Sequence, residues 1–238
     1  MSEDVSVTAG RRYDRPMAYP PTPIPILGLG AGSHAKSLLE AIRSRGAFDP
    51  VALVDDDADA SGELLGIPVA SVSDTLDRFQ ADGIRHAFVG VGGTSDAAVR
   101  RRVFERLRDA GFELPPILHA SAIVSPLARV GDGAQILACA VVNVDADIGK
   151  GAIVNTGAIV EHDCRIGDHA HVAPGVRLAG LVTVGEGAHV GIGAIAIEGV
   201  QIGAGAFVAA GAVVVRDVED GARVAGVPAR QMAAVSSS

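Results

Sequence analysis

The amino-acid sequence predicts two joined domains, an α/β domain of the Rossmann type followed by an all-β parallel β-helix. Three observations lead to this prediction. Predicted strands and helices alternate from Ile24 to Ala110, a glycine-rich turn joins the first strand to the first helix, and a six-residue repeat runs from Val124 to about Val218. The chain length allows for both domains.

The alternation of strands and helices defines the first domain. We expect strands at residues 24–29, 51–54, 67–69 and 86–91, and helices at 35–45, 73–80 and 96–110, the last ended by Gly111. Such an order forms βαβ units and a parallel sheet. Residues 1–23 mix charged and small polar residues and end in a proline-rich stretch, so we predict a flexible tail there.

The six-residue repeat defines the β-helix. Among every sixth residue from Val124 to Val214, fifteen of sixteen are branched aliphatics, and the exception is Ala196. A second series, from Ala128 to Val218, is small and apolar throughout. An α-helix would spread this period around its surface, because it has 3.6 residues per turn. We therefore predict three-sided coils of eighteen residues each, a little over five coils in all.

These patterns divide the chain into a tail at 1–23, a Rossmann-like domain at 24–118, a β-helix at 119–220 and a C-terminal capping segment at 221–238.

The composition excludes some functions. The net charge of −8 argues against a nucleic-acid partner, which needs a basic surface. The sequence has no signal segment and no long apolar run, so we expect no membrane insertion and a cytoplasmic location. We expect Cys139 and Cys164 in the core of the repeat, without a disulfide framework.

The glycine-rich turn is a candidate phosphate site. It reads Gly28-x-Gly30-x-Gly32, followed by Ser33 and His34, at a helix start where backbone N–H groups can bind a phosphate. The spacing differs from the G-x-G-x-x-G of nicotinamide-binding domains, which favours a nucleotide diphosphate that is part of a substrate. The alternative is that the glycines only permit a tight turn.

Two acidic residues, Asp55 and Asp56, follow the second predicted strand. The carboxyl ends of parallel strands meet at one edge of the sheet, close to the glycine-rich turn. We therefore expect both carboxylates near the ribose or base of the nucleotide.

Three polar residues, Glu161, His162 and Asp163, interrupt the apolar repeat. The inward positions on either side are Val160 and Cys164, so the three should lie at a corner and face outward. Packing does not require polar residues there. A histidine beside a carboxylate is the simplest general base, because the carboxylate fixes the tautomer and stabilises the imidazolium.

Two further histidines, His171 and His189, lie one predicted coil apart and should stack on the same face. Stacked histidines raise the possibility of zinc, which some hexapeptide β-helices bind as carbonic anhydrases. The spacing of His162, His169, His171 and His189 does not match the ligand spacing of those enzymes, so we expect no metal.

Several motifs resemble one family. The stretch from Gly30 to Lys36 is similar to a glycine turn, with Ser33 in place of a glycine, residues 119–126 resemble an entry into a β-helix, and Asn155-Thr156 with residues 161–164 and His171 resembles an active-site run. These are the motifs of the NeuD/PglD-type bacterial sugar acyltransferases, and the resemblance covers residues 24–232. It implies a left-handed β-helix and a homotrimer with its active sites between subunits.

The resemblance implies a role for individual residues. His162 would be the general base, Asp163 its support, and the Gly180 N–H the oxyanion donor. The residues expected to bind the substrate are Gly30, Gly32, Ser33, His34, Asp55, Asp56 and His171. The residues expected to bind acetyl-CoA are Asn155, His171, Gly180, Ala210, Val227 and Pro228. The last two belong to a Gly-x-Pro-Ala-basic segment, for which a simple capping loop is the alternative.

The implied function is acetyl transfer from acetyl-CoA to an amine on a nucleotide-linked amino sugar, in bacterial surface glycan biosynthesis. The attack is expected to be direct, without an acyl-enzyme. A first alternative is O-acetylation of a sialic acid or another sugar hydroxyl, because a His–Asp pair suits either nucleophile. A second alternative, from a different class, is a non-catalytic β-helical scaffold that binds nucleotides.

Overall fold

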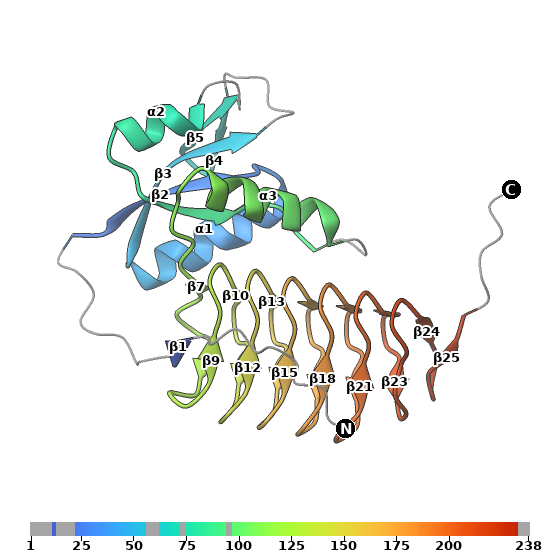
Figure 1. Ribbon diagram of the computed structural model, residues 1–238. Helices are drawn as coiled ribbons and strands as arrows, with labels where there is room; N and C mark the ends of the chain where they lie inside the picture. Colours follow the sequence, from blue (N-terminus) through green and yellow to red (C-terminus); the bar gives the residue numbers. More distant parts are fainter. Residues whose placement is uncertain (1–10, 13–21, 56–61, 72–74, 94–96, 233–238) are drawn as a thin grey trace, which may run out of the picture.

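The computed structural model describes residues 11–12, 22–55, 62–71, 75–93 and 97–232. It contains both predicted domains, and the fold class is confirmed: a mixed α/β domain precedes a left-handed β-helix. The first domain lies over the early coils of the β-helix, and the later coils extend beyond it (Figure 1).

The first domain is built on a five-stranded sheet with the order β4-β5-β3-β2-β6. Four strands are parallel, and β4 is antiparallel to β5. The strands are β2 (Ile24–Leu29), β3 (Phe48–Asp55), β4 (Glu63–Leu64), β5 (Ile67–Ser71) and β6 (His86–Val89). The helices are α1 (Ser33–Arg45), α2 (Thr75–Ala81) and α3 (Ala98–Asp109). Helix α1 packs with Ile26, Leu53 and Phe88 in one cluster, whereas α2 and α3 contribute to the cluster on the other face of the sheet.

Some boundaries differ from those expected. Strand β3 begins at Phe48 rather than at residue 51, because Phe48 and Asp49 pair with the first residues of β2. Strand β6 ends at Val89, two residues early, because Gly90 packs directly against the backbone of Gly30. The first two residues of the helix expected at 73–80 lie outside the described residues.

The β-helix consists of three parallel sheets of mostly two-residue strands. The domain-facing sheet holds β7 (Ile117–Leu118), β10 (Gln135–Ile136), β13 (Ile153–Val154), β16 (His171–Val172), β19 (His189–Val190), β22 (Phe207–Val208) and β24 (Arg223–Ala225). The apolar sheet holds β8 (Ile123–Val124), β11 (Val141–Val142), β14 (Ile159–Val160), β17 (Arg177–Leu178), β20 (Ile195–Ala196) and β23 (Val213–Val214). The polar sheet holds β9 (Arg129–Val130), β12 (Asp147–Ile148), β15 (Arg165–Ile166), β18 (Thr183–Val184) and β21 (Gln201–Ile202).

The coils stack in the predicted register. Each strand pairs with the strand eighteen residues later, as Ile148 does with Ile166. The aliphatic series from Val130 to Val214 and the small series from Ala128 to Val218 are buried throughout and form one continuous core. The register changes only at the end, where Phe207 pairs with Arg223, sixteen residues later. Residues Asp217–Gly221 lie within this shorter last step.

Two expectations need correction. Within the predicted flexible tail, β1 (Arg11–Arg12) pairs antiparallel with β9 and extends the polar sheet. Cys139 is exposed at a corner, not buried in the core, because it precedes the inward Ala140 and belongs to neither buried series of the repeat. Both cysteines are free. Among the described residues, no helix is both long and apolar enough to cross a membrane.

A buried arginine joins the first domain to the β-helix. Arg100 of α3 is 2% exposed and donates hydrogen bonds to the carbonyl oxygens of Gly151 and His169. The ring of Phe104, one turn later, meets the His169 ring edge-on. Burial lowers the pKa of Arg100 to about 10, and burial together with the nearby arginines lowers the pKa of His169 to about 4. His169 is therefore a neutral packing residue.

A new charge should have very different effects at an inward and at an outward position of the same coil. Val184→Asp places a carboxylate in the core, which costs several kcal/mol or a pKa shift of comparable cost, so the β-helix should unfold. Thr183→Asp is the matched control, because its side chain faces outward from the same strand. Thermal melting followed by circular dichroism checks this. Equal melting temperatures for the two variants would contradict the observed inward and outward register.

Candidate active site

The glycine-rich turn lies at the carboxyl edge of the first-domain sheet. Gly30 has φ of +105°, and a Cβ there would lie 2.9 Å from the Val91 side chain, so only glycine fits this turn. Gly32 is the residue before α1, with open space beside it, and Ser33 is exposed in the first turn of the helix. The first N–H groups of α1 therefore face a space where a phosphate can bind.

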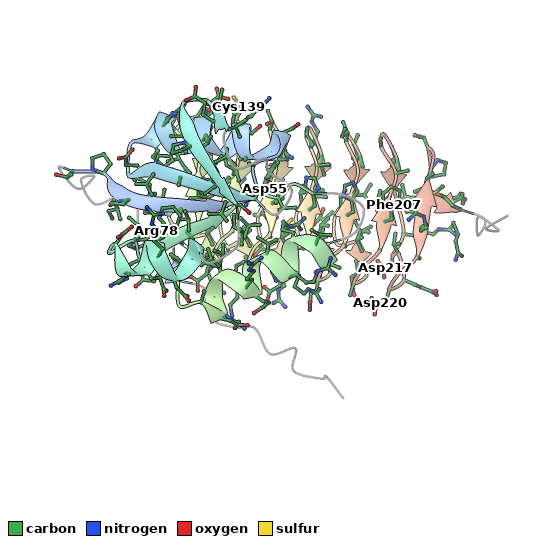
Figure 2. The ribbon with its side chains drawn as sticks, turned by 90° about the horizontal axis from the view of Figure 1, so that it is seen from above. Asp55, Arg78, Cys139, Phe207, Asp217 and Asp220 are labelled. Atoms are coloured by element: carbon green, nitrogen blue, oxygen red, sulfur yellow. The ribbon has the colours of Figure 1, made fainter. Side chains whose placement is uncertain are left out.

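Asp55 supports this turn. Its Oδ2 accepts a hydrogen bond from the Ala31 N–H over 2.6 Å, so the carboxylate holds the turn against the end of β3. Figure 2 shows Asp55 at the edge of the first domain that faces the later coils. The structure shows this contact with the turn, and the ribose contact expected for Asp55 stays a prediction. Asp56 lies outside the described residues.

His34 bonds across the junction between the domains. Gln135 donates from Nε2 to the Val89 carbonyl oxygen over 2.8 Å, so its Oε1 faces His34 Nε2 at 2.7 Å and accepts that proton. Burial lowers the pKa of His34, which keeps the ring neutral. His34, which the sequence predicts to bind the substrate, therefore uses one ring nitrogen to fix the first domain on the β-helix.

His171 lies under the first domain. Asn155 donates from Nδ2 to His171 Nε2 over 3.1 Å, because its Oδ1 already accepts from the Thr156 N–H. The proton of the neutral ring is therefore on Nδ1, which is buried, lies against Gly93 and has no partner among the described residues. Burial and the neighbouring positive groups lower the pKa of His171 to about 3. The ring of His189 meets it edge-on at 5.0 Å, so the predicted histidine stack is present.

His162 lies on the far side of the β-helix, at the corner between the apolar and polar sheets. Its Nδ1 is 2.9 Å from Asp163 Oδ2, and both side chains are about half exposed, at 49% and 51%. The hydrogen bond to Asp163 raises the pKa of His162. Because Nδ1 donates to the carboxylate, Nε2 of the neutral ring is the atom that can accept a proton. Glu161 turns away and accepts from Asn143 Nδ2 at 2.8 Å.

Gly180 stands one coil above His162 at the same corner. A Cβ on Gly180 would lie 2.5 Å from His162 Cε1 and 2.6 Å from Nε2, so the imidazole rests on bare backbone. The Gly180 N–H donates no hydrogen bond within the described part of the chain. The candidate general base therefore lies beside the backbone of a residue whose N–H is unused, an arrangement that suits acyl transfer.

The other residues predicted to bind the cofactor lie elsewhere. Asn155 and Ala210 are at the corner between the domain-facing and apolar sheets, and Val227 and Pro228 are exposed in the turn between β24 and β25 (Arg230–Gln231). Within one chain, the candidate site residues therefore form two separate groups. His162, with its Asp163 and Gly180 neighbours, occupies the corner opposite the domain-facing sheet, whereas the glycine-rich turn and His171 lie on that sheet.

Other chemistries find little support at these places. Burial raises the pKa of Cys164 to about 11, and its thiol donates to the Ala179 carbonyl oxygen, so it is a poor nucleophile. Within the described ranges, no group of three or more His, Cys, Asp or Glu side chains is placed to hold a metal ion. A cavity of about 550 Å³ opens at the amino ends of the first-domain strands, beside Phe48 and Phe112, away from every predicted site residue.

Comparison with known proteins identifies the family. The PglD N-terminal domain matches residues 26–107, and the bacterial transferase hexapeptide repeat matches residues 145–180. A histidine-to-alanine variant of GDP-perosamine N-acetyltransferase from Caulobacter crescentus, in complex with CoA and GDP-perosamine, is 41% identical. Its TM-score is 0.82, over 87% of this chain and 96% of that chain. This chain belongs to the PglD-type sugar N-acetyltransferases.

Two further PglD-type comparisons support the same architecture. The acetyltransferase domain of PglB from Neisseria gonorrhoeae, in complex with acetyl coenzyme A, is 34% identical with a TM-score of 0.80, over 88% of this chain and all of that one. WeeI from Acinetobacter baumannii is 25% identical with a TM-score of 0.77, over 88% and 100% of the two chains. A comparison with curated protein sequences gave no match.

Sequence reasoning missed two residues that contact the candidate site. Gln135 connects His34 to the first-domain sheet, and Gly93 covers the His171 ring, where a Cβ would overlap the imidazole. Gln135 carried a weak signal, because it is a buried polar residue within a largely apolar repeat. Gly93 was visible only as part of a glycine pair after a strand.

Replacing Gly180 by alanine should lower the activity without unfolding the β-helix. The Cβ of Gly180→Ala would collide with the His162 ring and push it away from the N–H of residue 180. We expect turnover to fall by at least about tenfold, since misplacing a catalytic group by about an ångström is that costly. Steady-state kinetics and thermal melting together check this. An active Gly180→Ala enzyme would show that the imidazole does not need this contact.

Proposed function

We propose that this protein transfers the acetyl group of acetyl-CoA to the amino group of a nucleotide-linked amino sugar, for bacterial surface glycan biosynthesis. The observation that carries the proposal is the His162–Asp163 pair, whose imidazole lies beside the backbone of Gly180, where a Cβ would be 2.6 Å from Nε2. Relatives with CoA, acetyl-CoA and GDP-perosamine bound support the substrate classes. Both free cysteines are compatible with a cytoplasmic enzyme, which is part of the proposal.

In the proposed reaction, the amine nitrogen attacks the thioester carbonyl carbon while His162 Nε2 accepts a proton from the nitrogen. Asp163 stabilises the resulting imidazolium through Nδ1. The Gly180 N–H donates to the oxygen of the tetrahedral intermediate. The carbon–sulfur bond then breaks, and the imidazolium returns its proton to the leaving CoA sulfur. The attack is direct, because Cys164 is buried and protonated.

The acceptor is proposed to bind through its diphosphate at the start of α1, next to Gly30 and Ser33. The exposed N–H groups of this helix start suit an anion. From there the sugar can extend toward the His171 face, because Gly93, which follows β6, lies directly on the His171 ring.

A homotrimer completes the proposed site. Of the six outward positions of the apolar sheet, five are aliphatic and the sixth is Arg177, and Ile123 is 66% exposed. This sheet lies between the His162 corner and the Asn155 corner. A cyclic assembly around it brings unlike surfaces together, so the His162 corner of one protomer would meet the Asn155 corner of the next. The two groups of site residues that one chain keeps apart would then share one cleft.

The catalytic proposal predicts a selective loss in His162→Ala. Removing a general base typically lowers turnover by about a hundred- to ten-thousand-fold. The melting temperature should not change, because the ring is exposed at a corner. The assay follows CoA release with acetyl-CoA and a panel of UDP-, GDP- and dTDP-linked amino sugars. Release only with sugar hydroxyl acceptors would indicate O-acetylation, and no release with any acceptor would favour the scaffold.

The Asp163→Asn variant tests the pH dependence. His162 acts as a base only when neutral, so activity should rise with pH through its raised pKa. Replacing the carboxylate by an amide removes the main cause of that increase, so the ascending limb should move to lower pH. Its plateau should fall between those of the parent and His162→Ala, because the imidazolium is less stabilised. An unchanged limb would assign the titration to the acceptor amine.

The trimer proposal predicts that Ile195→Lys separates the subunits. A lysine at this position would lie beside the outward Arg177 of the neighbouring strand and would bring three more like charges to the shared axis, which costs several kcal/mol for each uncompensated charge. Analytical ultracentrifugation should show monomers, and activity should be lost although His162 is intact. Gln201→Lys, exposed on the polar sheet at the next side of the same coil, is the control. An active Ile195→Lys monomer would place the whole site within one chain.

A further inference from the structure

A histidine, a serine and a cysteine meet at the corner between the domain-facing and apolar sheets, and we call them the thiol cluster. His119 and Ser121 belong to the turn between β7 and β8, and Cys139 belongs to the turn between β10 and β11, one coil later. The Ser121 Oγ lies 2.7 Å from His119 Nδ1 and 3.6 Å from Cys139 Sγ. The cluster includes neither His162 nor the glycine-rich turn.

The hydrogen-bond directions in the thiol cluster follow from one fixed donor. The backbone N–H of Ser121 donates to His119 Nδ1 over 3.0 Å, so this ring nitrogen carries no proton. The Ser121 hydroxyl must therefore be the donor to Nδ1. Its oxygen accepts from the Cys139 N–H at 3.0 Å and keeps a lone pair for the thiol. The chain of donors therefore runs from the Cys139 S–H through the Ser121 O–H to the imidazole.

The repeat itself does not require a cysteine at this corner. Cys139 has φ of 57°, in the left-handed region. The equivalent positions of the next four coils are all glycines with positive φ: Gly157, Gly175, Gly193 and Gly211. A left-handed backbone is unfavourable for a residue with a Cβ, and such residues gather at functional sites. Packing therefore does not explain the cysteine, which leaves its thiol as the feature to explain.

The thiol cluster is both accessible and held in place. Cys139 and Ser121 are exposed, and His119 is half-buried. Figure 2 shows Cys139 at the outer margin of the molecule, beside the first domain. The Ser44 hydroxyl oxygen of α1 accepts from the Ala120 N–H over 3.0 Å, which fixes the turn that carries His119. A reagent from solution can therefore reach a thiol whose proton has a path to a base.

The sulfur that could pair with Cys139 has to come from another molecule. Cys164, the other cysteine of the chain, is buried, and its thiol donates to the Ala179 carbonyl oxygen. In the proposed trimer, the corner of Cys139 faces the His162 corner of the next protomer, so the symmetry does not bring two Cys139 thiols together. A small disulfide is the partner that such an exposed thiol can meet.

We propose that Cys139 is a thiol modification site that exchanges with low-molecular-weight disulfides, with Ser121 and His119 as its proton relay. His119 takes the Ser121 hydroxyl proton while that hydroxyl takes the thiol proton. The Cys139 thiolate attacks one sulfur of the disulfide, whose S–S bond breaks as the new S–S bond forms. The departing thiolate receives the proton from His119. Cys139 is thereby oxidised and one reagent sulfur is reduced to a thiol, and excess thiol reverses the exchange.

Incubation of the full chain with oxidised glutathione tests the proposal. Intact-mass spectrometry should show one glutathionyl group, which peptide mapping places on Cys139 and dithiothreitol removes. Ser121→Ala and His119→Gln should each slow its formation by at least about tenfold, because each breaks the path from the thiol to a base. Ser121→Thr keeps the hydroxyl and should react at the parent rate.

Two controls separate the relay from the packing of the coil. Ser125→Ala removes a hydroxyl that accepts from the Leu127 N–H at another corner of the same coil, and should leave the rate unchanged. Cys139→Gly should take up no glutathione and keep at least the parent melting temperature, because glycine suits the left-handed backbone.

Four outcomes would overturn the proposal. They are a parent that takes up no glutathione, a folded parent modified at Cys164, a covalent dimer through Cys139 in place of the adduct, and equal rates for the parent, Ser121→Ala and His119→Gln. None of them bears on acetyl transfer, because the thiol cluster shares no residue with the candidate active site.

Discussion

Backbone hydrogen bonds between coils set the register on which every part of the candidate site depends. Each strand pairs with the strand eighteen residues later, so residues at that spacing become direct neighbours in space. Gly180 thereby lies on His162, and His189 lies beside His171. A one-residue change in coil length would move these pairs to different faces. The chemistry at the corner is therefore a product of the stacking rather than of any local loop.

The junction between the domains depends on a few buried polar groups. Arg100 bonds only to carbonyl oxygens in the described structure, and Gln135 bridges His34 and Val89. Hydrogen bonds of this kind make burial tolerable, and they have strict geometry. The consequence is that the first domain has one position on the domain-facing sheet. The glycine-rich turn is thereby held at a set distance from His171, which a sheet resting on apolar contacts alone would not guarantee.

Much of this arrangement could be predicted from the sequence, because the repeat places each residue on a known side of a coil. The buried series, the outward His162 and the paired His171 and His189 follow from counting. The role of His34 could not be counted, since it bonds to Gln135 of another domain, 101 residues away. The exposed Cys139 was misjudged, although it precedes the inward Ala140 and belongs to neither buried series of the repeat. Residue roles taken from the family remain predictions.

The two antiparallel strands at the margins of the β-helix have a consequence for its behaviour in a crowded cell. A parallel stack has no natural end, because each last coil presents unpaired N–H and C=O groups that could template another copy. Strand β25 covers the final edge of the domain-facing sheet, and β1 covers the first edge of the polar sheet. Both run against the direction of the stack, so a further coil cannot continue the pattern there. These short strands therefore oppose the end-to-end association of β-helices into fibres.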